Sequence, residues 1–464
     1  MLLFNSRSPC LALLATTLAG TQVASAIQLD LSSTQSIKSA ASTIAHSMMS
    51  YYKGNLTGQT VGLLPQPYYW WEAGAMFDQM IHYWYYTGDT SYNDVVTQGL
   101  LAQISPDKDF MPSNQTLTEG NDDQAFWAFA AMSAAELNFP EPSRKDVSWL
   151  ALAQAVFNEQ ASRWETTTCG GGLRWQIFSW NKGYEYKNSI SNGCFFQLAA
   201  RLARYTGNQT YADWAIKTWD WMESTPLVTA QYNIYDGVDM RDNCTKPIPL
   251  EWTYNIGTFL MGASSLYNYT DGDPTWRRVT EGMLNGTKVF FPASLGGNIM
   301  QEVACEPQQS CNYDQPSFKA YLSRWMAVTT QLAPFSKDFI MPKLQASAAG
   351  AAKQCSGAPN GGKTCGRTWN TATWDGKVGV GEEMSALSII QANLISKVPP
   401  PVTADKGGTS QGDPLAGTGT SNSQPSDPLL TRSITMGDRA GAGILTTIVL
   451  GGLLGSTWWM SFGS

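Results

Sequence analysis

Apolar side chains recur at the three- and four-residue spacing of an amphipathic helix from about Ile27 to Lys397. The clearest runs are Phe126, Phe129, Ala130, Ser133 and Leu137, and then Phe195, Leu198, Leu202 and Tyr205. The alternation of apolar and polar positions that is typical of a half-buried strand is scarce in the same region. The pattern therefore predicts an all-α domain over residues 27–397.

A short internal repeat marks where several of these helices end. Residues 86–89 (Tyr-Thr-Gly-Asp), 205–208 (Tyr-Thr-Gly-Asn) and 269–273 (Tyr-Thr-Asp-Gly-Asp) each follow an apolar helical stretch. In each copy a glycine stops one helix and a polar residue caps the next. The sequence Ser143-Arg144-Lys145-Asp146 predicts a further helix start in the form of a capping box.

The predicted apolar helices begin at intervals of about 50–70 residues, and such a period is typical of a repeat architecture. They begin near Trp70, Asp122, Ser191, Asn255, Pro316 and Gly381. If an outer helix follows each of them, six helix hairpins can close into an (α/α)6 barrel with the apolar helices inside. The alternative is an open α-solenoid that binds proteins, with chain ends far apart. Polar and aromatic residues cluster at the starts of the presumed inner helices, which favours the barrel.

Both ends of the chain have the composition of targeting signals. Residues 1–26 combine Arg7, an apolar run and the small residues Ala24-Ser25-Ala26, which predicts a secretory signal peptide. Residues 398–437 are rich in Pro, Gly, Ser and Thr and predict a linker that does not pack. Residues 438–464 hold a polar spacer and an apolar tail without a basic flank, which predicts a GPI-attachment signal. A tail anchor that spans the membrane is the alternative.

The amino-acid composition excludes several classes of protein and several kinds of catalytic site. Charged residues make up 14% of the chain, the formal net charge is −7, and aromatic residues make up 12%. This balance argues against a nucleic-acid-binding surface and against a disordered chain. The two histidines, His46 and His82, are too few for a serine triad or a histidine-rich zinc site, so carboxylates must carry any catalysis. We expect no nucleotide cofactor, because no phosphate-binding glycine motif lies between a strand and a helix. We also expect no metal, because hard cations need more oxygen ligands than the acidic loop at residues 119–123 offers.

The cysteines and the glycosylation sequences agree with a secreted protein. Cys10 leaves with the signal peptide, and short spacing pairs Cys305 with Cys311 and Cys355 with Cys365. Cys194 lies in an apolar helical stretch, where a buried free thiol is common, so Cys169 is expected to pair with Cys244. Six Asn-x-Ser/Thr sequences could carry glycans: Asn55, Asn114, Asn208, Asn243, Asn268 and Asn285.

Asp122 and Asp123 are the strongest candidates for catalysis. They follow a Gly120-Asn121 turn and open an amphipathic helix. A helix N-terminus favours ionised aspartates, so a plain capping role is the alternative interpretation. Two adjacent carboxyls can reach the separation of about 5–5.5 Å that a retaining glycosidase needs for its nucleophile and its acid/base group. Their mutual repulsion also moves their pKa values apart.

Sugars offer apolar C–H faces to aromatic rings and hydroxyl groups to a few fixed polar side chains. The presumed starts of the inner helices carry residues of both kinds. We therefore expect the following residues to contact substrate: Trp70, Trp71, Asn121, Trp175, Asn188, Tyr254, Asn255 and Trp374. Packing between helices is the alternative for each tryptophan, and helix capping is favoured for Glu72 and Glu251.

Four long segments, residues 68–89, 119–136, 169–193 and 250–263, resemble glycoside hydrolase family 76. The resemblance is strongest to fungal GPI-anchored members that act in cell-wall biogenesis, and it covers essentially the whole mature region. It implies an (α/α)6 fold and cleavage of α-1,6-mannosidic bonds with retention of configuration. It also implies that Asp122 is the nucleophile and that Asp123 is the acid/base residue.

The predicted function is that of a retaining endo-α-1,6-mannosidase whose donor is mannan or the mannose core of GPI glycans. A GPI anchor would hold the protein at the outer face of the plasma membrane or in the cell wall. There the same pair could act as a transglycosylase, with a wall polysaccharide as the acceptor. A non-catalytic glycan-binding protein on the same fold is the alternative, although a binder does not need a second adjacent acid. We expect a monomer with no nucleic-acid partner.

Overall fold

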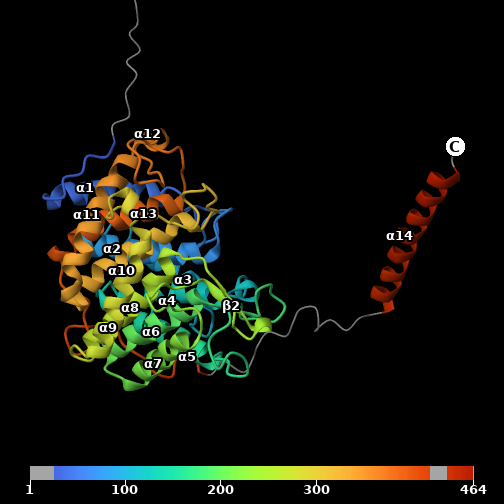
Figure 1. Ribbon diagram of the computed structural model, residues 1–464, viewed down its shortest axis with the longest axis horizontal. Coiled ribbons are helices and arrows are strands. Elements are labelled where there is room, and N and C mark those ends of the chain that lie inside the picture. The colour runs from blue at the N-terminus through green and yellow to red at the C-terminus, as the bar shows by residue number, and fades with distance from the viewer. Residues whose placement is uncertain (1–25, 419–435, 463–464) are drawn as a thin grey trace, which may run out of the picture.

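Twelve helices of the computed structural model form two concentric rings (Figure 1). The structure describes residues 26–418 and 436–462. The inner ring consists of α2 (Trp70–Thr87), α4 (Asn121–Glu136), α6 (Ser189–Thr206), α8 (Thr253–Tyr269), α10 (Phe318–Leu332) and α13 (Val380–Gln391). The outer ring consists of α1 (Thr34–Met49), α3 (Asn93–Ala102), α5 (Trp149–Ser162), α7 (Gln209–Ser224), α9 (Pro274–Gly286) and α11 (Lys337–Gln354).

The inner ring is closed. Each inner helix packs against the next, α13 returns to contact α2, and α1 from the start of the chain packs on α13 (Figure 1). Helices from opposite ends of the domain are therefore neighbours. The open α-solenoid is excluded, and the predicted (α/α)6 barrel is confirmed.

The distribution of apolar side chains explains the two rings. Every residue of α4 except Asp123 is buried, because this inner helix contacts other helices on all sides. The outer helix α9 buries one face, formed by Trp276, Val279, Thr280 and Met283, which is the spacing of a surface helix. The width of the apolar face thus explains whether a helix lies in the inner or the outer ring.

The predicted starts of the inner helices agree with the structure to within two residues. Two of the repeat glycines end helices as expected, since Gly88 and Gly207 adopt the left-handed conformation with φ of 78° and 71°. The helix start predicted at Ser143 is wrong. Helix α5 begins at Trp149 after the cap residue Ser148, while Arg144 and Asp146 form an exposed ion pair in the preceding turn.

A small antiparallel sheet lies beside the start of α6. It consists of β1 (Tyr186–Asn188), β2 (Gly237–Asp239) and β3 (Pro247–Ile248), and Asn188 pairs with Gly237. The remaining helices are α12 (Pro359–Gly362), α14 (Met436–Phe462) and the short 3₁₀ helices η1 (Thr116–Thr118), η2 (Met240–Asp242), η3 (Thr287–Phe290), η4 (Ala293–Leu295), η5 (Gln315–Ser317), η6 (Pro334–Ser336) and η7 (Ala392–Lys397).

Residues 398–418, which we call the strap, pack on the barrel. The prediction that the chain stops packing after Lys397 is therefore wrong for this segment. The backbone N–H of Val402 donates to the carbonyl of Glu136 at 2.8 Å, and that of Ala404 donates to the carbonyl of Tyr205 at 2.8 Å. Both acceptors lie in the last turns of inner helices, where carbonyl groups lack partners within the helix.

The cysteines pair as the sequence predicts. The disulfides are Cys169–Cys244, Cys305–Cys311 and Cys355–Cys365, and Cys194 is a buried free thiol. The asparagines of the six glycosylation sequences, listed above, are all exposed. Their glycosylation remains a prediction.

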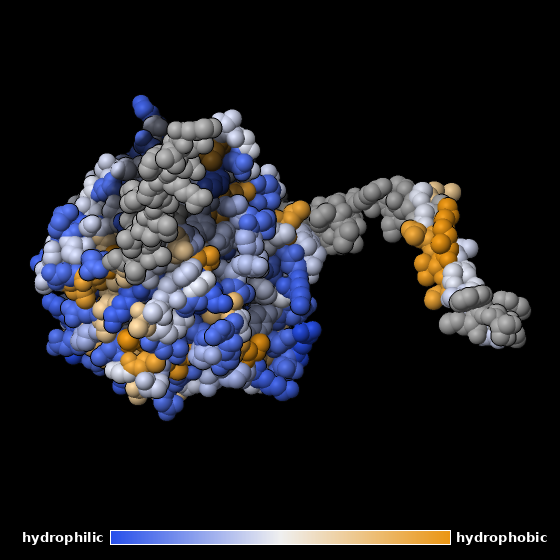
Figure 2. All heavy atoms as spheres, turned by 90° about the horizontal axis from the view of Figure 1, so that it is seen from above, coloured by the Kyte–Doolittle hydropathy of each residue, from blue (hydrophilic) through white to orange (hydrophobic). Residues whose placement is uncertain are grey.

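The predicted signal peptide lies almost entirely outside the described residues, as do the second half of the predicted linker and the last two residues. Helix α14 covers most of the predicted GPI-attachment signal, and its apolar side chains, such as those of Ile444 and Leu445, are mostly exposed (Figure 2). None of the helices in residues 26–418 and 436–462 has the length and apolar character needed to cross a bilayer.

Candidate active site

A cavity of about 200 Å³ opens where the inner helices begin. Helices α2, α4, α6, α8 and α10 each direct their N-terminal end or the residue just before it towards this cavity. It is lined by Trp71, Asp122, Asp123, Phe126, Trp175, Tyr186, Asn188, Asp236, Tyr254, Asp314 and Phe318. The lining thus combines four carboxyl groups with aromatic rings and includes no basic side chain.

The first turn of α4 presents the two adjacent aspartates to the cavity. Gly120 precedes this helix in an extended conformation, and its backbone N–H donates to Oδ2 of Asp123 at 2.7 Å. The backbone N–H of Asp123 donates to Oδ1 of Asp122 at 3.1 Å. Asn188 adds a side-chain hydrogen bond to Asp122. Asp122 therefore receives more of the hydrogen bonds that stabilise an ionised carboxylate.

Burial controls the protonation of this pair. It raises the pKa of Asp122 well above its usual value, and the neighbouring charge of Asp123 raises it further. Burial also raises the pKa of Asp123 to about 7, with a smaller contribution from the negative charge of Asp314. Two such carboxyls cannot both ionise easily, so they retain a proton near neutral pH. A protonated acid beside a carboxylate is what general acid catalysis requires.

Aromatic rings form the apolar part of the wall. The rings of Tyr254 and Phe318 stack with their centroids 3.8 Å apart, and Trp71 lies 4.6 Å from Phe126. Trp175 lines the cavity from the loop that precedes β1. Such surfaces suit the apolar face of a sugar ring.

Four of the residues predicted to contact substrate line the cavity, namely Trp71, Trp175, Asn188 and Tyr254. Their contact with substrate remains a prediction.

The other four have packing or anchoring roles instead. Trp70 stacks on Trp127 and donates its indole N–H to Gln103. Trp374 donates to the backbone carbonyl of Lys377. Asn121 is held by the backbone carbonyl of Arg174 and by the side chains of Gln160 and Arg163, and Asn255 is fully buried beside Asp236.

Five lining residues were not among the site residues predicted from the sequence: Phe126, Tyr186, Asp236, Asp314 and Phe318. The hydroxyl of Tyr186 donates to Oδ2 of Asp236 at 2.6 Å, which fixes both groups at the cavity wall. Asp314 precedes the inner-helix start predicted at Pro316, in the same kind of place as Asp122, and this signal could have identified it. Asp236 directly precedes β2, and strands of only two or three residues leave no alternating pattern in the sequence from which this position could have been predicted.

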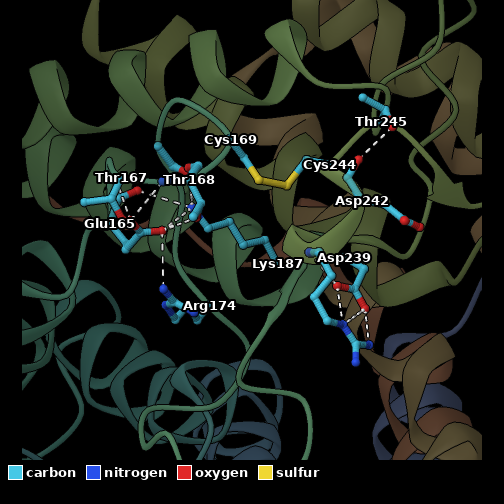
Figure 3. The surroundings of a disulfide bond; sticks show 12 residues. Glu165, Thr167, Thr168, Cys169, Arg174, Lys187, Asp239, Asp242, Cys244 and Thr245 are labelled. Atoms are coloured by element: carbon cyan, nitrogen blue, oxygen red, sulfur yellow. Dashed lines mark hydrogen bonds and ion pairs between the residues drawn. A yellow bond between two sulfur atoms is a disulfide. The ribbon is translucent and has the colours of Figure 1, made fainter.

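The loop and strand that lead to Asn188 are held by charge and by a disulfide (Figure 3). Lys187, which is fully buried, pairs with Glu165 at 2.8 Å, and Arg174 approaches the same carboxylate at 3.6 Å. Cys169 in this loop is joined to Cys244 beyond β2. Among the described residues, no cluster of three or more His, Cys, Asp or Glu side chains is arranged to hold a metal ion.

A closed barrel of helix hairpins with two adjacent carboxyls in a cavity with an aromatic wall indicates the class of a glycoside hydrolase. The sequence model of Glycosyl hydrolase family 76 matches residues 36–405. The chain belongs to this family.

Two comparisons show how similar the chain is to individual members. It is 48% identical to mannan endo-1,6-alpha-mannosidase DCW1 of Saccharomyces cerevisiae, over 95% of this chain and 97% of that protein. The crystal structure of Dfg5 from Chaetomium thermophilum in complex with glucosamine is 43% identical, with a TM-score of 0.80 over 84% of this chain and 97% of that one. The α-1,6-mannanase of a Salegentibacter species shares the fold at 18% identity, with a TM-score of 0.61 over 77% of this chain and 98% of that one.

Proposed function

We propose that this protein is a retaining endo-α-1,6-mannosidase in which Asp122 is the nucleophile and Asp123 is the acid/base residue. The observation that carries the proposal is the adjacent carboxylate pair at the start of α4, the buried Asp122 and the half-buried Asp123, with an aromatic wall around it. The name of the Saccharomyces cerevisiae relative supports the linkage. A Salegentibacter α-1,6-mannanase with two consecutive aspartates replaced by asparagine is described as an inactive variant in complex with α-1,6-mannotriose, which supports the pair.

The geometry supports a double displacement. The protonated carboxyl of Asp123 donates its proton to the glycosidic oxygen while the Asp122 carboxylate attacks the anomeric carbon, so that the C–O bond breaks and a mannosyl-aspartate ester forms. The Asp123 carboxylate then takes a proton from the incoming hydroxyl, which attacks the same carbon and releases Asp122. Two inversions retain the α-configuration. The hydrogen bonds that Asp122 accepts lower its pKa and so oppose burial and the charge of Asp123, which raise it.

The acidic lining supports a donor that carries an amino sugar. Four carboxyl groups without a basic partner among the lining residues suit neutral hydroxyls or an ammonium group. The Chaetomium thermophilum relative was crystallised with glucosamine. We therefore include the mannose core of GPI glycans, beside α-1,6-mannan, as a donor.

Transfer to a second sugar is the proposed biological outcome. A bound acceptor hydroxyl of a wall polysaccharide would compete with water for the ester, and aromatic rings such as those of Trp71 and Trp175 offer a surface on which the acceptor sugar can stack. The secretory signal predicted at residues 1–26 and the GPI-attachment signal predicted at residues 438–464 support a protein that is anchored at the cell surface or in the wall, and we propose that it acts as a monomer.

The test is to incubate the purified protein with α-1,6-mannooligosaccharides, with and without excess acceptor sugar, and to follow the products by anomeric NMR. Shortened products that first appear in the α-form support a retaining mannosidase, and lengthened products support transfer. Asp122→Asn and Asp123→Asn should each lower the rate by more than about 100-fold, whereas the exposed Asp220→Asn should not. Full activity of Asp122→Asn would contradict the proposal, and binding without turnover by the unmutated protein would favour a glycan-binding protein.

A further inference from the structure

Asn121, the residue before the carboxylate pair, is held by hydrogen bonds from all of its polar groups. Its backbone N–H donates to the carbonyl of Trp175 at 2.9 Å, and its side-chain Nδ2 donates to the carbonyl of Arg174 at 2.9 Å. Its backbone carbonyl accepts from Nε2 of Gln160 at 2.7 Å, and its Oδ1 accepts from Nη1 of Arg163 at 3.1 Å. Asn121 is 2% exposed, so water does not compete for these contacts.

Gln124, the residue after the pair, is held from the same side. Nη1 of Arg163 also donates to Oε1 of Gln124 at 2.7 Å. Nη2 of Arg163 pairs with Oε2 of Glu159 at 2.8 Å, and Nε2 of Gln124 donates to the same oxygen at 2.6 Å. Arg163, Gln124 and Glu159 thus form a closed set of hydrogen bonds that joins the end of α5 to the first turn of α4.

We infer that Arg163 is a positioning residue for the Asp122–Asp123 pair. Its planar guanidinium contacts the residues on both sides of the pair, Asn121 and Gln124, and therefore fixes the rotation of the first turn that carries the two carboxyls. The inference rests on the proposed function of the pair. It assigns to Arg163 the orientation of the attacking carboxylate rather than any contact with substrate, since Arg163 does not line the cavity.

The test compares Arg163→Met with Arg201→Met. Arg201 serves as the control, because it makes an ion pair of 2.7 Å with Glu136, the last residue of α4, and its side chain is 4% exposed, compared with 15% for that of Arg163. Both variants should lose thermal stability. Arg163→Met should also lower kcat on α-1,6-mannotriose by about 10- to 100-fold with less than a twofold change in KM, because small misplacements of a reacting group are costly. Arg201→Met should retain kcat.

Arg163→Lys keeps the positive charge but lacks the planar guanidinium that donates from two nitrogens. Its kcat should therefore lie between those of Arg163→Met and the unmutated protein. If Arg163→Met does not fold at the assay temperature, Arg163→Lys decides, and a kcat lowered at least threefold at unchanged KM supports the inference. A kcat of either folded variant within twofold of the unmutated protein would overturn it, as would an equal fall in kcat for Arg201→Met. A fully active Asp122→Asn would instead overturn the proposed function, whatever the Arg163 variants show.

Discussion

Gly120 is the residue on which the placement of both carboxyls depends most closely. A Cβ atom at this position would lie 2.4 Å from Oδ1 of Asp122 and 3.2 Å from Oδ2 of Asp123. The backbone of Gly120, with φ −91° and ψ 161°, is open to any residue. The contact with the Asp122 side chain is therefore the closest obstacle to a substitution here, and the backbone carbonyl oxygen of Trp175, at 3.1 Å from the added Cβ, is the next.

Gly120→Ala is expected to lower kcat by about 10- to 100-fold, because the carboxylate of Asp122 must move away from the added methyl group. The melting temperature should fall by only a few degrees, since alanine fits the backbone. Steady-state kinetics on α-1,6-mannotriose, with thermal unfolding followed by circular dichroism, separates the two effects. Unchanged kcat in the alanine variant would show that the carboxylate can adopt another productive position.

Asp314 is expected to set the alkaline limit of activity through Asp123. The acid/base residue must be protonated to act as an acid, so kcat should fall as the pH rises through the Asp123 pKa of about 7. The negative charge of Asp314 raises this pKa. Asp314→Asn removes that charge and should therefore move the alkaline limb of the kcat–pH profile to lower pH. A limb that stays in place or moves to higher pH would contradict this coupling.

At the residue scale, the two aspartates predicted as catalytic line the cavity, and so do four of the eight residues predicted to contact substrate. Successive residues of a helix point about 100° apart, so Trp71 reaches the cavity while Trp70 packs on Trp127. Tyr254 and the buried Asn255 differ in the same way. The sequence identifies the helix end, but the rotation of each helix is determined by its neighbours.

At the scale of elements, the helix starts were predictable where a glycine stop and a cap coincide, as at Gly88 and Gly207. The small sheet was not, because strands of two or three residues give no alternation. Helix α5 was misplaced since Ser143 belongs to an exposed turn, and the apolar face begins only at Trp149. Short elements depend on tertiary contacts that a local pattern does not contain.

The disulfide beside this sheet allows a prediction at the same scale. Cys169–Cys244 closes a loop of sequence separation 75, whereas Cys305–Cys311 spans a separation of only 6. Chain entropy assigns about 4 kcal/mol to the long loop and about 2 kcal/mol to the short one. Replacing both Cys169 and Cys244 by Ser should therefore lower the free energy of unfolding more than replacing Cys305 and Cys311. Urea denaturation measures both, and an equal or reversed order would contradict the entropic account.

At the scale of the whole molecule, composition misled at one place. Residues 398–437 have the Pro, Gly, Ser and Thr content of an unpacked linker, yet the strap crosses the ends of α4 and α6. Its backbone N–H groups donate to carbonyls at the ends of these helices, and its backbone carbonyls accept hydrogen bonds from Arg204. Amino-acid composition describes side chains, whereas these contacts are made by backbone groups that every residue has. Composition therefore could not predict them. Closure of the ring, in contrast, was predicted correctly, because the regular spacing of six apolar helices indicated the repeat and the polar and aromatic residues at their starts favoured a closed barrel.

Because the strap packs on the barrel, we expect the folded domain to extend to Thr418 and not to end at Lys397. A chain that ends at Lys397 loses the hydrogen bonds to Glu136 and Tyr205, the bond that the Ser410 hydroxyl accepts from the backbone N–H of Leu150, and the bond that the backbone N–H of Asp413 donates to Gln154. At about 1 kcal/mol for each bond, its melting temperature should fall by more than about 5 °C, whereas a chain that ends at Thr418 should keep its stability.

The activity of the two shortened chains at 25 °C should be similar. The strap crosses the C-terminal ends of the inner helices, and the carboxylate pair lies at the opposite end of α4, which has 16 residues and is therefore about 24 Å long. Arg204→Met in the chain that ends at Thr418 should reproduce part of the thermal loss, because Arg204 donates to the carbonyls of Pro401 and Val402. Differential scanning calorimetry with assays below the transition tests both points. Equal melting temperatures for the two chains would mean that the strap lies on the barrel without stabilising it.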